Sequence, residues 1–228
     1  MSTATPGVEI SAVGLAAHGP DGTIFRDVRL TAPAAGLTVI AGPGGAGRTS
    51  LLLALGGRFR TSAGTVTVDG SRNAKVARAR TAIARARPGL DLEEHLLVSE
   101  AVAEAQAIGG GRPADVALAR MYDLLRVDPP GHALVEHLST VEQLLFAVAL
   151  AAAGHPGAVL VDDVDTGIAG ADLSRAWRAL RELADSGVTV VATATAPPPT
   201  GADHVVDLPG HHLHPRVAHH QHPRGGTA

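Results

Sequence analysis

Residues 42–49 read Gly-Pro-Gly-Gly-Ala-Gly-Arg-Thr, and they stand between two apolar stretches. Residues 37–41 before them predict a buried strand, and residues 49–55 after them predict a helix that ends at the glycines 56 and 57. A glycine-rich turn between a strand and a helix points backbone N–H groups inward at the positive end of the helix, where they bind phosphate without many side chains. The predicted phosphate-binding residues are Gly42, Pro43, Gly44, Gly45, Ala46, Gly47, Arg48, Thr49 and Ser50. A glycine-rich turn with no ligand is the alternative.

The loop fits the phosphate-binding pattern G-x-x-x-x-G-K-[ST] except at Arg48, which stands where the pattern has lysine. Arginine keeps the positive charge, but its longer, planar guanidinium cannot enter a pocket shaped for an ammonium group without a shift. We therefore expect weakened or altered contact with the terminal phosphate of a nucleotide. Thr49 follows it and offers a hydroxyl to a magnesium ion.

A second apolar stretch, residues 158–161, ends in two carboxylates, Asp162 and Asp163. A carboxylate at the end of a buried strand can hold Mg²⁺ opposite the hydroxyl of Thr49. Taken without the glycine loop, the same pair would indicate a solvated strand end. The two features together predict a site for a magnesium-bound phosphate.

Composition allows one sizeable α/β domain, since hydrophobic residues make up 45% of the 228-residue chain and charged residues 18%. Aromatic residues are only 2%, so the core must be aliphatic, which suits a parallel sheet covered by helices. The net charge of −3 provides no basic field, and nucleic acid is not expected as a partner. The longest apolar run, residues 144–153, is too short to span a bilayer, so membrane contact would need a partner subunit.

Strands and helices alternate along the chain, which predicts a doubly wound, mostly parallel sheet. Residues 8–40 alternate short apolar stretches with turns, as in an antiparallel edge sheet made of separate short strands. The Ala- and Arg-rich residues 74–87 are interpreted as an exposed segment. Further helices are expected at residues 98–107, 113–125, 140–153 and 173–184, and further strands at 65–68, 188–192 and 204–208.

This order of motifs resembles the ATP-binding subunits of ABC transporters over nearly the whole chain, from about residue 8 to 208. Counterparts of the family's motifs lie at residues 42–49, 62–70, 138–139, 162–163 and 202–206. The resemblance implies an α/β fold of the P-loop NTPase class, an ABC-type cassette with a mostly parallel sheet core, an antiparallel β edge sheet and a small helical subdomain. We expect a single cassette over residues 1–208, with the helical subdomain at about 90–140 contacting a membrane partner.

The resemblance also implies ATP and Mg²⁺ as cofactors, with Thr49 and Asp162 as metal ligands and Asp163 at the position of the catalytic glutamate. Aspartate can polarise water, but it is shorter by one methylene, about 1.5 Å of reach. His18 stands where the family has an aromatic residue that stacks on adenine. A plain surface histidine is the alternative.

The chain departs from the family at several motifs. Its signature segment reads Leu-Ser-Thr-Val-Glu at residues 138–142 instead of beginning Leu-Ser-Gly-Gly-Gln, and Glu142 brings negative charge towards phosphate. Ala194 or Thr195 stands where the family has its switch histidine, and Ala169 stands where the family's D-loop has aspartate. No glutamine lies between residues 72 and 100, where the family has one. We therefore expect ATP binding with weakened hydrolysis, and a symmetric ATP sandwich should be disfavoured.

Three functional hypotheses remain open. The first is a cytoplasmic ATP-binding subunit, peripheral at the inner face of the plasma membrane, that works with a separately encoded transmembrane subunit and forms a homo- or heterodimer with another ABC cassette. The second is a catalytically inactive regulatory nucleotide-binding subunit. The third is a soluble ABC protein without a transport role.

The terminal residues 209–228 are rich in histidine, proline and glycine, and we interpret them as a disordered tail. Histidine clusters at this density bind zinc, nickel or copper readily. The alternatives are a physiological metal role and adventitious binding by the tail.

Overall fold

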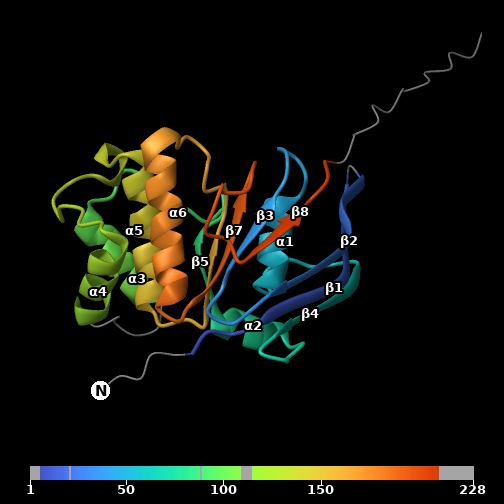
Figure 1. Ribbon diagram of the computed structural model, residues 1–228. Coiled ribbons are helices and arrows are strands. Elements are labelled where there is room, and N and C mark those ends of the chain that lie inside the picture. The colour runs from blue at the N-terminus through green and yellow to red at the C-terminus, as the bar shows by residue number, and fades with distance from the viewer. Residues whose placement is uncertain (1–5, 21, 88, 109–114, 211–228) are drawn as a thin grey trace, which may run out of the picture.

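The computed structural model describes residues 6–20, 22–87, 89–108 and 115–210. Its elements follow one another as shown in Figure 1. In chain order they are β1 Ile10–Gly19, β2 Gly22–Ala32, β3 Leu37–Ala41, α1 Arg48–Leu55, β4 Ala63–Val68, α2 Ala74–Arg80, β5 Thr81–Arg85, α3 Val98–Ile108, α4 Asp115–Leu125, the 3-10 helix η1 Val135–His137, α5 Thr140–Ala153, β6 Ala158–Val161, α6 Gly170–Asp185, β7 Thr189–Ala194 and β8 His204–Asp207. Among the described helices, none is long and apolar enough to cross a membrane.

The larger of the two sheets has the strand order β5-β6-β7-β3-β8, and every neighbouring pair in it is parallel. Strands β3, β6 and β7 are buried at every residue. Such continuous burial is typical of parallel strands that are covered on both faces. The predicted parallel core of the α/β fold is therefore confirmed.

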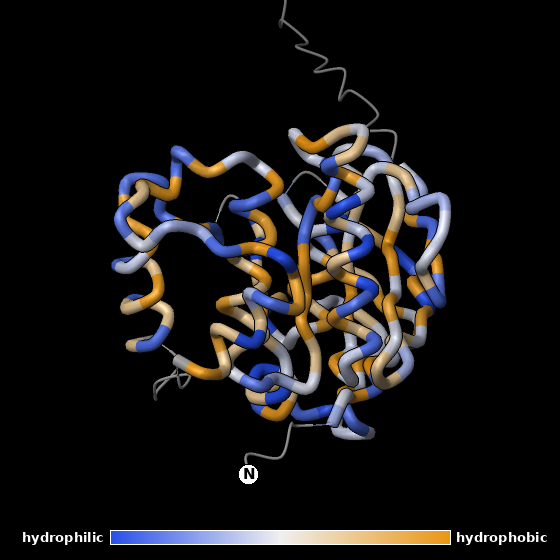
Figure 2. Tube along the Cα trace, turned by 60° about the vertical axis from the view of Figure 1, so that its left-hand side comes forward, coloured by the Kyte–Doolittle hydropathy of each residue, from blue (hydrophilic) through white to orange (hydrophobic). Residues whose placement is uncertain are grey.

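Two aliphatic cores lie on opposite faces of this sheet, because successive strand residues point to opposite sides. Val39 and Val159 pack with α5 and α6. Their chain neighbours Ile40 and Leu160 pack with α1 and the antiparallel sheet on the other face. Hydrophobic stretches run along the strands in the middle of the molecule, and hydrophilic stretches gather on the outer loops (Figure 2). This layering brings the carboxyl ends of the parallel strands to one edge.

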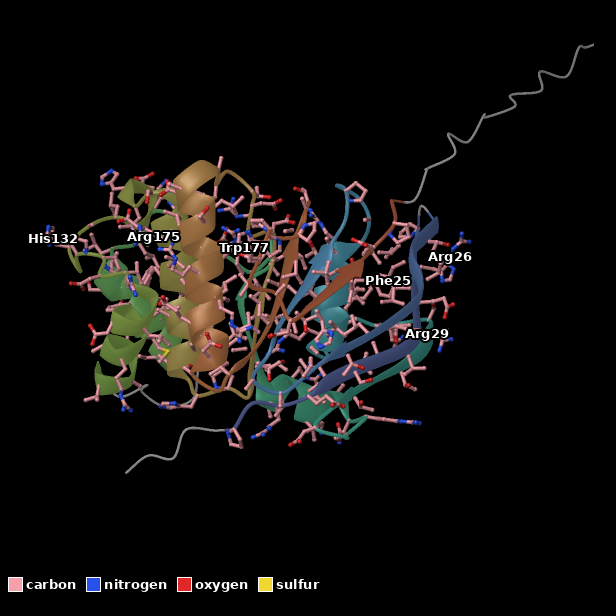
Figure 3. All side chains as sticks on the ribbon, in the orientation of Figure 1. Phe25, Arg26, Arg29, His132, Arg175 and Trp177 are labelled. Carbon is pink, nitrogen blue, oxygen red and sulfur yellow. The ribbon has the colours of Figure 1, made fainter. Side chains whose placement is uncertain are left out.

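The antiparallel sheet has the order β2-β1-β4. The prediction of an antiparallel edge sheet is correct, but β2 runs unbroken where separate strands were expected. Arg26 and Asp27 are both exposed, and the register shift there lets the strand continue past them, with Asp27 at a φ of 45°. Phe25 points from β2 into the core, whereas Arg26 and Arg29 point away (Figure 3).

Residues 74–87 are only in part the exposed segment that their composition indicates, because Ala77 alone is buried in the helix at 74–80, whereas no residue of the strand at 81–85 is exposed. They form α2, whose first turn is capped by the side chain of Asn73, and then β5, which pairs in parallel with β6. Thr81, Arg85 and Ala86 are buried there. The expectation was wrong for β5 because its five residues, Thr-Ala-Ile-Ala-Arg, contain one large aliphatic side chain and end in a charged one, which gives no clear strand pattern.

The helices expected in the middle of the chain are present. Helices α3, α4, α5 and α6 gather on the same side of the parallel sheet (Figure 1). Trp177 from α6 is buried in the core beneath them. The histidine-rich tail expected at residues 209–228 lies outside the described residues, except for Pro209 and Gly210.

Candidate nucleotide-binding site

The phosphate loop connects β3 to α1, and its two ends are packed while its middle is open. A Cβ atom on Gly42 would lie 2.3 Å from the carbonyl oxygen of Leu208. At Gly47, where φ is 86°, a Cβ would lie 2.5 Å from the carbonyl oxygen of Ile24. Around Gly44 and Gly45, in contrast, no described atom comes within 4 Å of such a Cβ. Glycine is thus required where the loop meets β2 and the end of β8, and the space between is open to a ligand.

Helix α1 starts at Arg48, directly after the loop. No described side chain caps its N-terminus, and its first turn contains no acidic residue. The positive end of a helix attracts anions, and here no carboxylate of the first turn neutralises it. Ser50 lies in this first turn and is half-buried. The start of α1 is therefore suited to phosphate.

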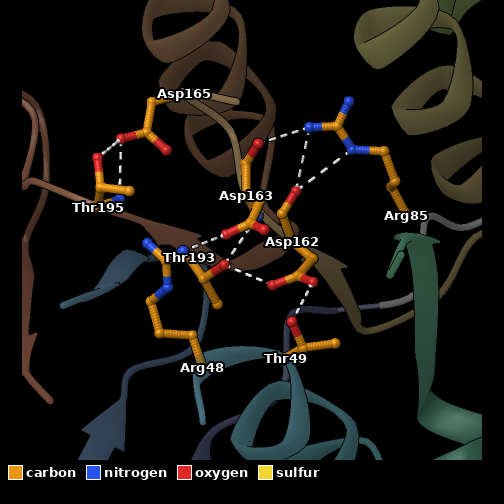
Figure 4. Close-up of polar contacts among 8 residues, drawn as sticks. All are labelled: Arg48, Thr49, Arg85, Asp162, Asp163, Asp165, Thr193 and Thr195. Atoms are coloured by element: carbon orange, nitrogen blue, oxygen red, sulfur yellow. Dashed lines mark hydrogen bonds and ion pairs between the residues drawn. The ribbon is translucent and has the colours of Figure 1, made fainter. Parts of the chain in front are cut away.

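Arg48 turns towards the carboxyl end of β6, where its Nη2 lies 2.7 Å from Oδ1 of Asp163 (Figure 4). Only 8% of the Arg48 side chain is exposed. The two atoms are close enough for an ion pair, but neither Arg48 Nη1 nor Asp163 Oδ1 has a hydrogen-bond partner among the described residues. The contact is therefore a charge pairing without hydrogen-bond alignment, and the guanidinium keeps an unused, buried donor.

The structure brings Thr49 and Asp162 together. Thr49 Oγ1 donates a hydrogen bond of 2.6 Å to Oδ2 of Asp162, and Thr193 Oγ1 donates one of 2.6 Å to Oδ1. Thr193 also accepts a 2.8 Å hydrogen bond from the backbone N–H of Asp163. The Asp162 carboxylate is buried, and two hydroxyls fix its orientation.

These oxygen donors fit magnesium. Mg²⁺ is usually held by one or two carboxylates, water and the phosphates of its substrate, and a hydroxyl beside a carboxylate supplies the protein's share. No group of three or more His, Cys, Asp or Glu side chains that could hold a metal occurs in the part of the chain that the structure describes. A hydroxyl beside a carboxylate therefore suits a magnesium ion that arrives with phosphate.

Asp163 is half-buried and has a φ of 47°, in the left-handed region that non-glycine residues seldom adopt. Burial raises the pKa of its carboxyl, and the neighbouring Asp162 carboxylate adds to the increase, while Arg48 opposes it. A carboxylate with a raised pKa is a stronger base, but this one is already paired with a guanidinium.

Asp165 is a site residue that sequence reasoning missed. Its Oδ2 accepts hydrogen bonds from the hydroxyl and, at 2.8 Å, from the backbone N–H of Thr195. This joins the loop after β6 to the loop after β7 (Figure 4). The signal was the spacing of three aspartates in residues 162–165.

Arg85 was also missed. It is 2% exposed, and it donates hydrogen bonds to the backbone carbonyl oxygens of Asp162 and Asp163. An arginine among small residues was the only signal. It was hidden because the whole segment was interpreted as exposed.

His18 is exposed near the end of β1, and its Nδ1 lies 2.9 Å from the hydroxyl of Ser62. Its partner in β2 is Thr23, which precedes the Ile24 that contacts Gly47. The strand pairing therefore places His18 close in the sheet to the segment that borders the phosphate loop. Adenine stacking by this histidine stays a prediction.

The degenerate signature segment caps its own helix. Glu142 Oε2 accepts hydrogen bonds from the backbone N–H of Ser139 at 2.9 Å and from its hydroxyl at 2.5 Å. The Ser139 side chain in turn accepts from the backbone N–H of Glu142, which completes a capping box at the start of α5. These bonds lower the pKa of the Glu142 carboxyl. The donors of Ser139 are thus engaged within the chain.

Residues 25–166, which contain the phosphate loop, the signature segment and both site aspartates, match the family described as ABC transporter. The chain belongs to the ABC transporter family. The resemblance expected from the order of the motifs is therefore confirmed.

Similar proteins include an uncharacterized ABC transporter ATP-binding protein of Mycobacterium tuberculosis, which is 31% identical over 198 residues. The match covers 81% of this chain but 58% of that protein. The energy-coupling factor transporter ATP-binding protein EcfA of Methanothermobacter thermautotrophicus is 29% identical, with 77% of this chain and 59% of that protein covered. The arginine transport ATP-binding protein ArtP of Escherichia coli is 27% identical, with 76% of both chains covered. This chain thus spans about three fifths of the length of the first two relatives.

Solved ABC cassettes have the same fold. A dimeric bacterial ABC transporter cassette superimposes with a TM-score of 0.73 at 18% identity, over 88% of this chain and 94% of the other. The cbiO1 subunit from Clostridium perfringens, part of an ABC transporter complex, gives a TM-score of 0.73 at 17% identity, over 87% and 84% of the two chains. The ABC-type cassette fold predicted from the sequence is therefore confirmed.

Proposed function

We propose that this ABC-family chain binds Mg-ATP in the loop of residues 42–49 and hydrolyses it slowly. The observation that carries the proposal is the 2.6 Å contact between Thr49 and Asp162 beside an open glycine loop. A hydroxyl from the start of α1 and a carboxylate from the end of β6 meet where a bound phosphate would bring its magnesium ion.

Each part of the site has its own share in binding. The backbone N–H groups of the loop and the start of α1 would hold the phosphate oxygens. Arg48 Nη1, which is buried and without a partner among the described residues, would donate to one of them. Thr49 and Asp162 would hold Mg²⁺, which supplies positive charge to offset the charge of the phosphates. His18 would stack on the adenine.

Slow hydrolysis follows from the pairing of Arg48 with Asp163. An incoming phosphate must share or displace the carboxylate that already contacts the guanidinium at 2.7 Å. The same carboxylate is our candidate for the base that activates water, and the ion pair ties it to Arg48. This one ion pair therefore weakens the binding of phosphate by Arg48 and makes the Asp163 carboxylate less available to activate water.

The proposal is tested by measuring the melting temperature with and without Mg-ATP, beside phosphate release from the same protein. Ligand at about 100 times its Kd stabilises a folded protein by about 2.7 kcal/mol, so Mg-ATP should raise Tm by several degrees. Arg48→Ala should reduce this rise, and Arg48→Lys, which restores the lysine of the pattern, should increase it. Arg29→Ala, at an exposed position on β2, is the control.

Two results would contradict the proposal. No rise in Tm with any nucleotide would refute binding. Rapid phosphate release that is lost in Asp163→Asn would refute slow hydrolysis and would make Asp163 an effective catalytic residue.

We further propose a separately encoded transmembrane subunit as partner, with this chain at the cytoplasmic face of the membrane. The names of the relatives support this, since they are ATP-binding proteins of transporters. Co-purification with the product of a neighbouring gene for a membrane protein is the test. Failure of every such pair to associate, together with recovery of the chain free of membranes, would favour a soluble role.

A regulatory subunit is the second candidate, and the engagement of Ser139 by Glu142 favours it. Because the N–H and the hydroxyl of Ser139 already donate to Glu142, the signature segment has fewer hydrogen-bond donors left for the ATP bound by a facing cassette. We expect Asp163→Asn protein to stay monomeric with Mg-ATP in size-exclusion chromatography and to dimerise only with a second, different cassette. A stable homodimer formed with Mg-ATP would count against this candidate.

A further inference from the structure

Arg85 is the bulkiest of the fully buried side chains in the part of the chain that the structure describes. It is the last residue of β5, at the edge of the parallel sheet. The register between β5 and β6 shifts just before it, because Ile83 pairs with Leu160 and Arg85 with Val161. Ala84 is thus an extra residue in β5. Irregularities of this kind change the direction in which the next side chain points.

The Arg85 side chain reaches the turn that follows β6. Its Nε and Nη2 lie 3.3 and 3.2 Å from the carbonyl oxygen of Asp162 and donate to it, and Nη2 also donates to the carbonyl oxygen of Asp163 at 2.6 Å. The backbone N–H of Asp162 in turn donates to the carbonyl oxygen of Arg85 at 3.1 Å. Both backbone polar groups of Asp162 are therefore bonded to Arg85.

Packing alone does not account for a guanidinium at this place. A buried charge loses its hydration, and an aliphatic side chain of similar volume fills a core without that loss. What the guanidinium adds is a set of hydrogen bonds to two carbonyl groups at a point where Asp163 has the unfavourable φ of 47°. The bonds stabilise this turn in one conformation.

That conformation sets the direction of two side chains. Asp162 leaves the turn towards Thr49, and Asp163 leaves it towards Arg48 (Figure 4). A rotation of the turn would separate the first pair, which is held by one hydrogen bond of 2.6 Å. The guanidinium donates to the carbonyl oxygens of Asp162 and Asp163, so its hydrogen bonds act on the two carboxylates through the main chain. Its positive charge also opposes the rise in the pKa of the Asp163 carboxyl.

We propose that Arg85 is a positioning residue that holds the main chain of Asp162 and Asp163 so that the Asp162 carboxylate is aligned with Thr49 for a magnesium-bound phosphate. The part of this inference that concerns magnesium rests on the proposed nucleotide binding. The part that concerns the turn does not.

The first experiment therefore uses the protein without nucleotide. Hydrogen exchange should become faster in Arg85→Met at residues 162–164, whose amides donate to Arg85, Thr193 Oγ1 and the Thr193 carbonyl, while the amides that join β3 to β7 keep their protection. Arg58→Met is the control for the loss of a guanidinium that bonds main-chain carbonyls, because the more exposed Arg58 donates to the carbonyl oxygens of Gly56 and Thr81, away from the aspartates. Unchanged exchange at residues 162–164 in Arg85→Met would overturn the inference.

The second experiment compares the Kd for ADP in EDTA with the Kd in excess Mg²⁺. Loss of a group that orients a metal ligand costs about tenfold to a hundredfold in metal affinity. Arg85→Met should lose about tenfold of the enhancement by Mg²⁺. Its affinity for ADP without magnesium should not fall, since the phosphate loop is untouched and any movement of Asp163 would only release Arg48. Arg58→Met should retain both values.

The outcomes separate a positioning role from a structural one. Equal weakening with and without Mg²⁺, or an unchanged enhancement, would overturn the positioning role. If Arg85→Met does not fold, Arg85→Lys decides, because a lysine keeps the charge but lacks the reach and the planar donor fork of the guanidinium, so it reproduces the bonds to the two carbonyls only in part, and an intermediate enhancement is expected. Wild-type protein that binds no nucleotide would refute the proposed function, and the exchange experiment would still decide on Arg85.

Discussion

The phosphate loop, residues 42–49, and the turn after β6, residues 162–165, form the two halves of the site and present their polar groups in different ways. In the loop the middle glycines are exposed and no described atom lies close to them. In the turn each aspartate already has a partner in the chain. Asp162 is bonded to Thr49 and Thr193, Asp163 is paired with Arg48, and Asp165 is bonded to Thr195. The loop offers a backbone cradle that is open to a ligand, whereas the carboxylates of the turn are already engaged within the chain.

Because of this difference, nucleotide binding and ATP hydrolysis would depend on different parts of the site. A backbone cradle depends on a few glycines, so we expect it to tolerate Arg48 in place of lysine. A hydrolytic site depends on a carboxylate that is free to act on water, and here the carboxylate of Asp163 is paired with the guanidinium of Arg48. A chain can therefore keep the first and weaken the second.

The largest effect is expected at the closed end of the loop. Gly47→Ala would place a Cβ 2.5 Å from the carbonyl oxygen of Ile24, at a φ of 86°. We expect the free energy of unfolding to fall by about 2 kcal/mol or more, and nucleotide binding to be lost, because the loop must move to relieve the clash. Urea denaturation and an ADP titration measure the two effects.

Gly44→Ala is the control for this prediction, since it adds the same methyl group where no described atom lies within 4 Å. It should change stability by less than about 0.5 kcal/mol. Equal stability of the two variants would break the contrast between a packed end and an open middle of the loop.

An intermediate effect is expected for Asp163→Asn, which removes the anion that competes with phosphate for Arg48. Affinity for ADP in EDTA should rise by about threefold to tenfold, where tenfold corresponds to about 1.4 kcal/mol. The gain should vanish when Arg48→Ala is present as well, because the freed guanidinium is its cause.

Asp172→Asn, at an exposed position in the first turn of α6, controls for the loss of a negative charge in general. A fall in ADP affinity on Asp163→Asn would show that the carboxylate assists binding. The turn would then no longer contrast with the loop in the way described.

The smallest effect on stability is expected for Glu142 in the signature segment. Its carboxylate, like those of the turn after β6, is already bonded within the chain. Its pKa is lowered by the hydrogen bonds with Ser139. A lowered carboxyl pKa contributes stability above the unfolded value, 4.5, and that stability is lost as pH falls through the folded value. Wild type should exceed Glu142→Gln by about 0.5 kcal/mol at pH 7, since the group is well solvated, and the difference should shrink below pH 4.5.

Thermal melts of the two proteins across this pH range measure the difference. Glu136→Gln, at an exposed site in η1, is the control and should show no such dependence. A difference that grows as pH falls would contradict the capping role of Glu142.

Local patterns were enough to predict the loop and the strands beside it. Residues 158–161 are a continuous aliphatic run and residues 37–41 are one with a single threonine, both bounded by glycine or aspartate, and such runs are buried strands in parallel sheets. The edge strand β5 could not be predicted in this way. Its five residues, Thr81–Arg85, contain a single large aliphatic side chain, Ile83, among small residues and one arginine, and they form a strand only because β6 offers a partner edge.

The sequence by itself determined the glycine cradle, the helix that follows it and the aspartates at the end of β6, because each depends on neighbours within a few residues. Tertiary structure alone decided what those groups contact. The pairing of Arg48 with Asp163, and the bonds from Arg85 to the same turn, join segments about 80 residues or more apart in the chain. No local pattern encodes such contacts, since they exist only once the strands have paired and brought their carboxyl ends to one edge of the sheet.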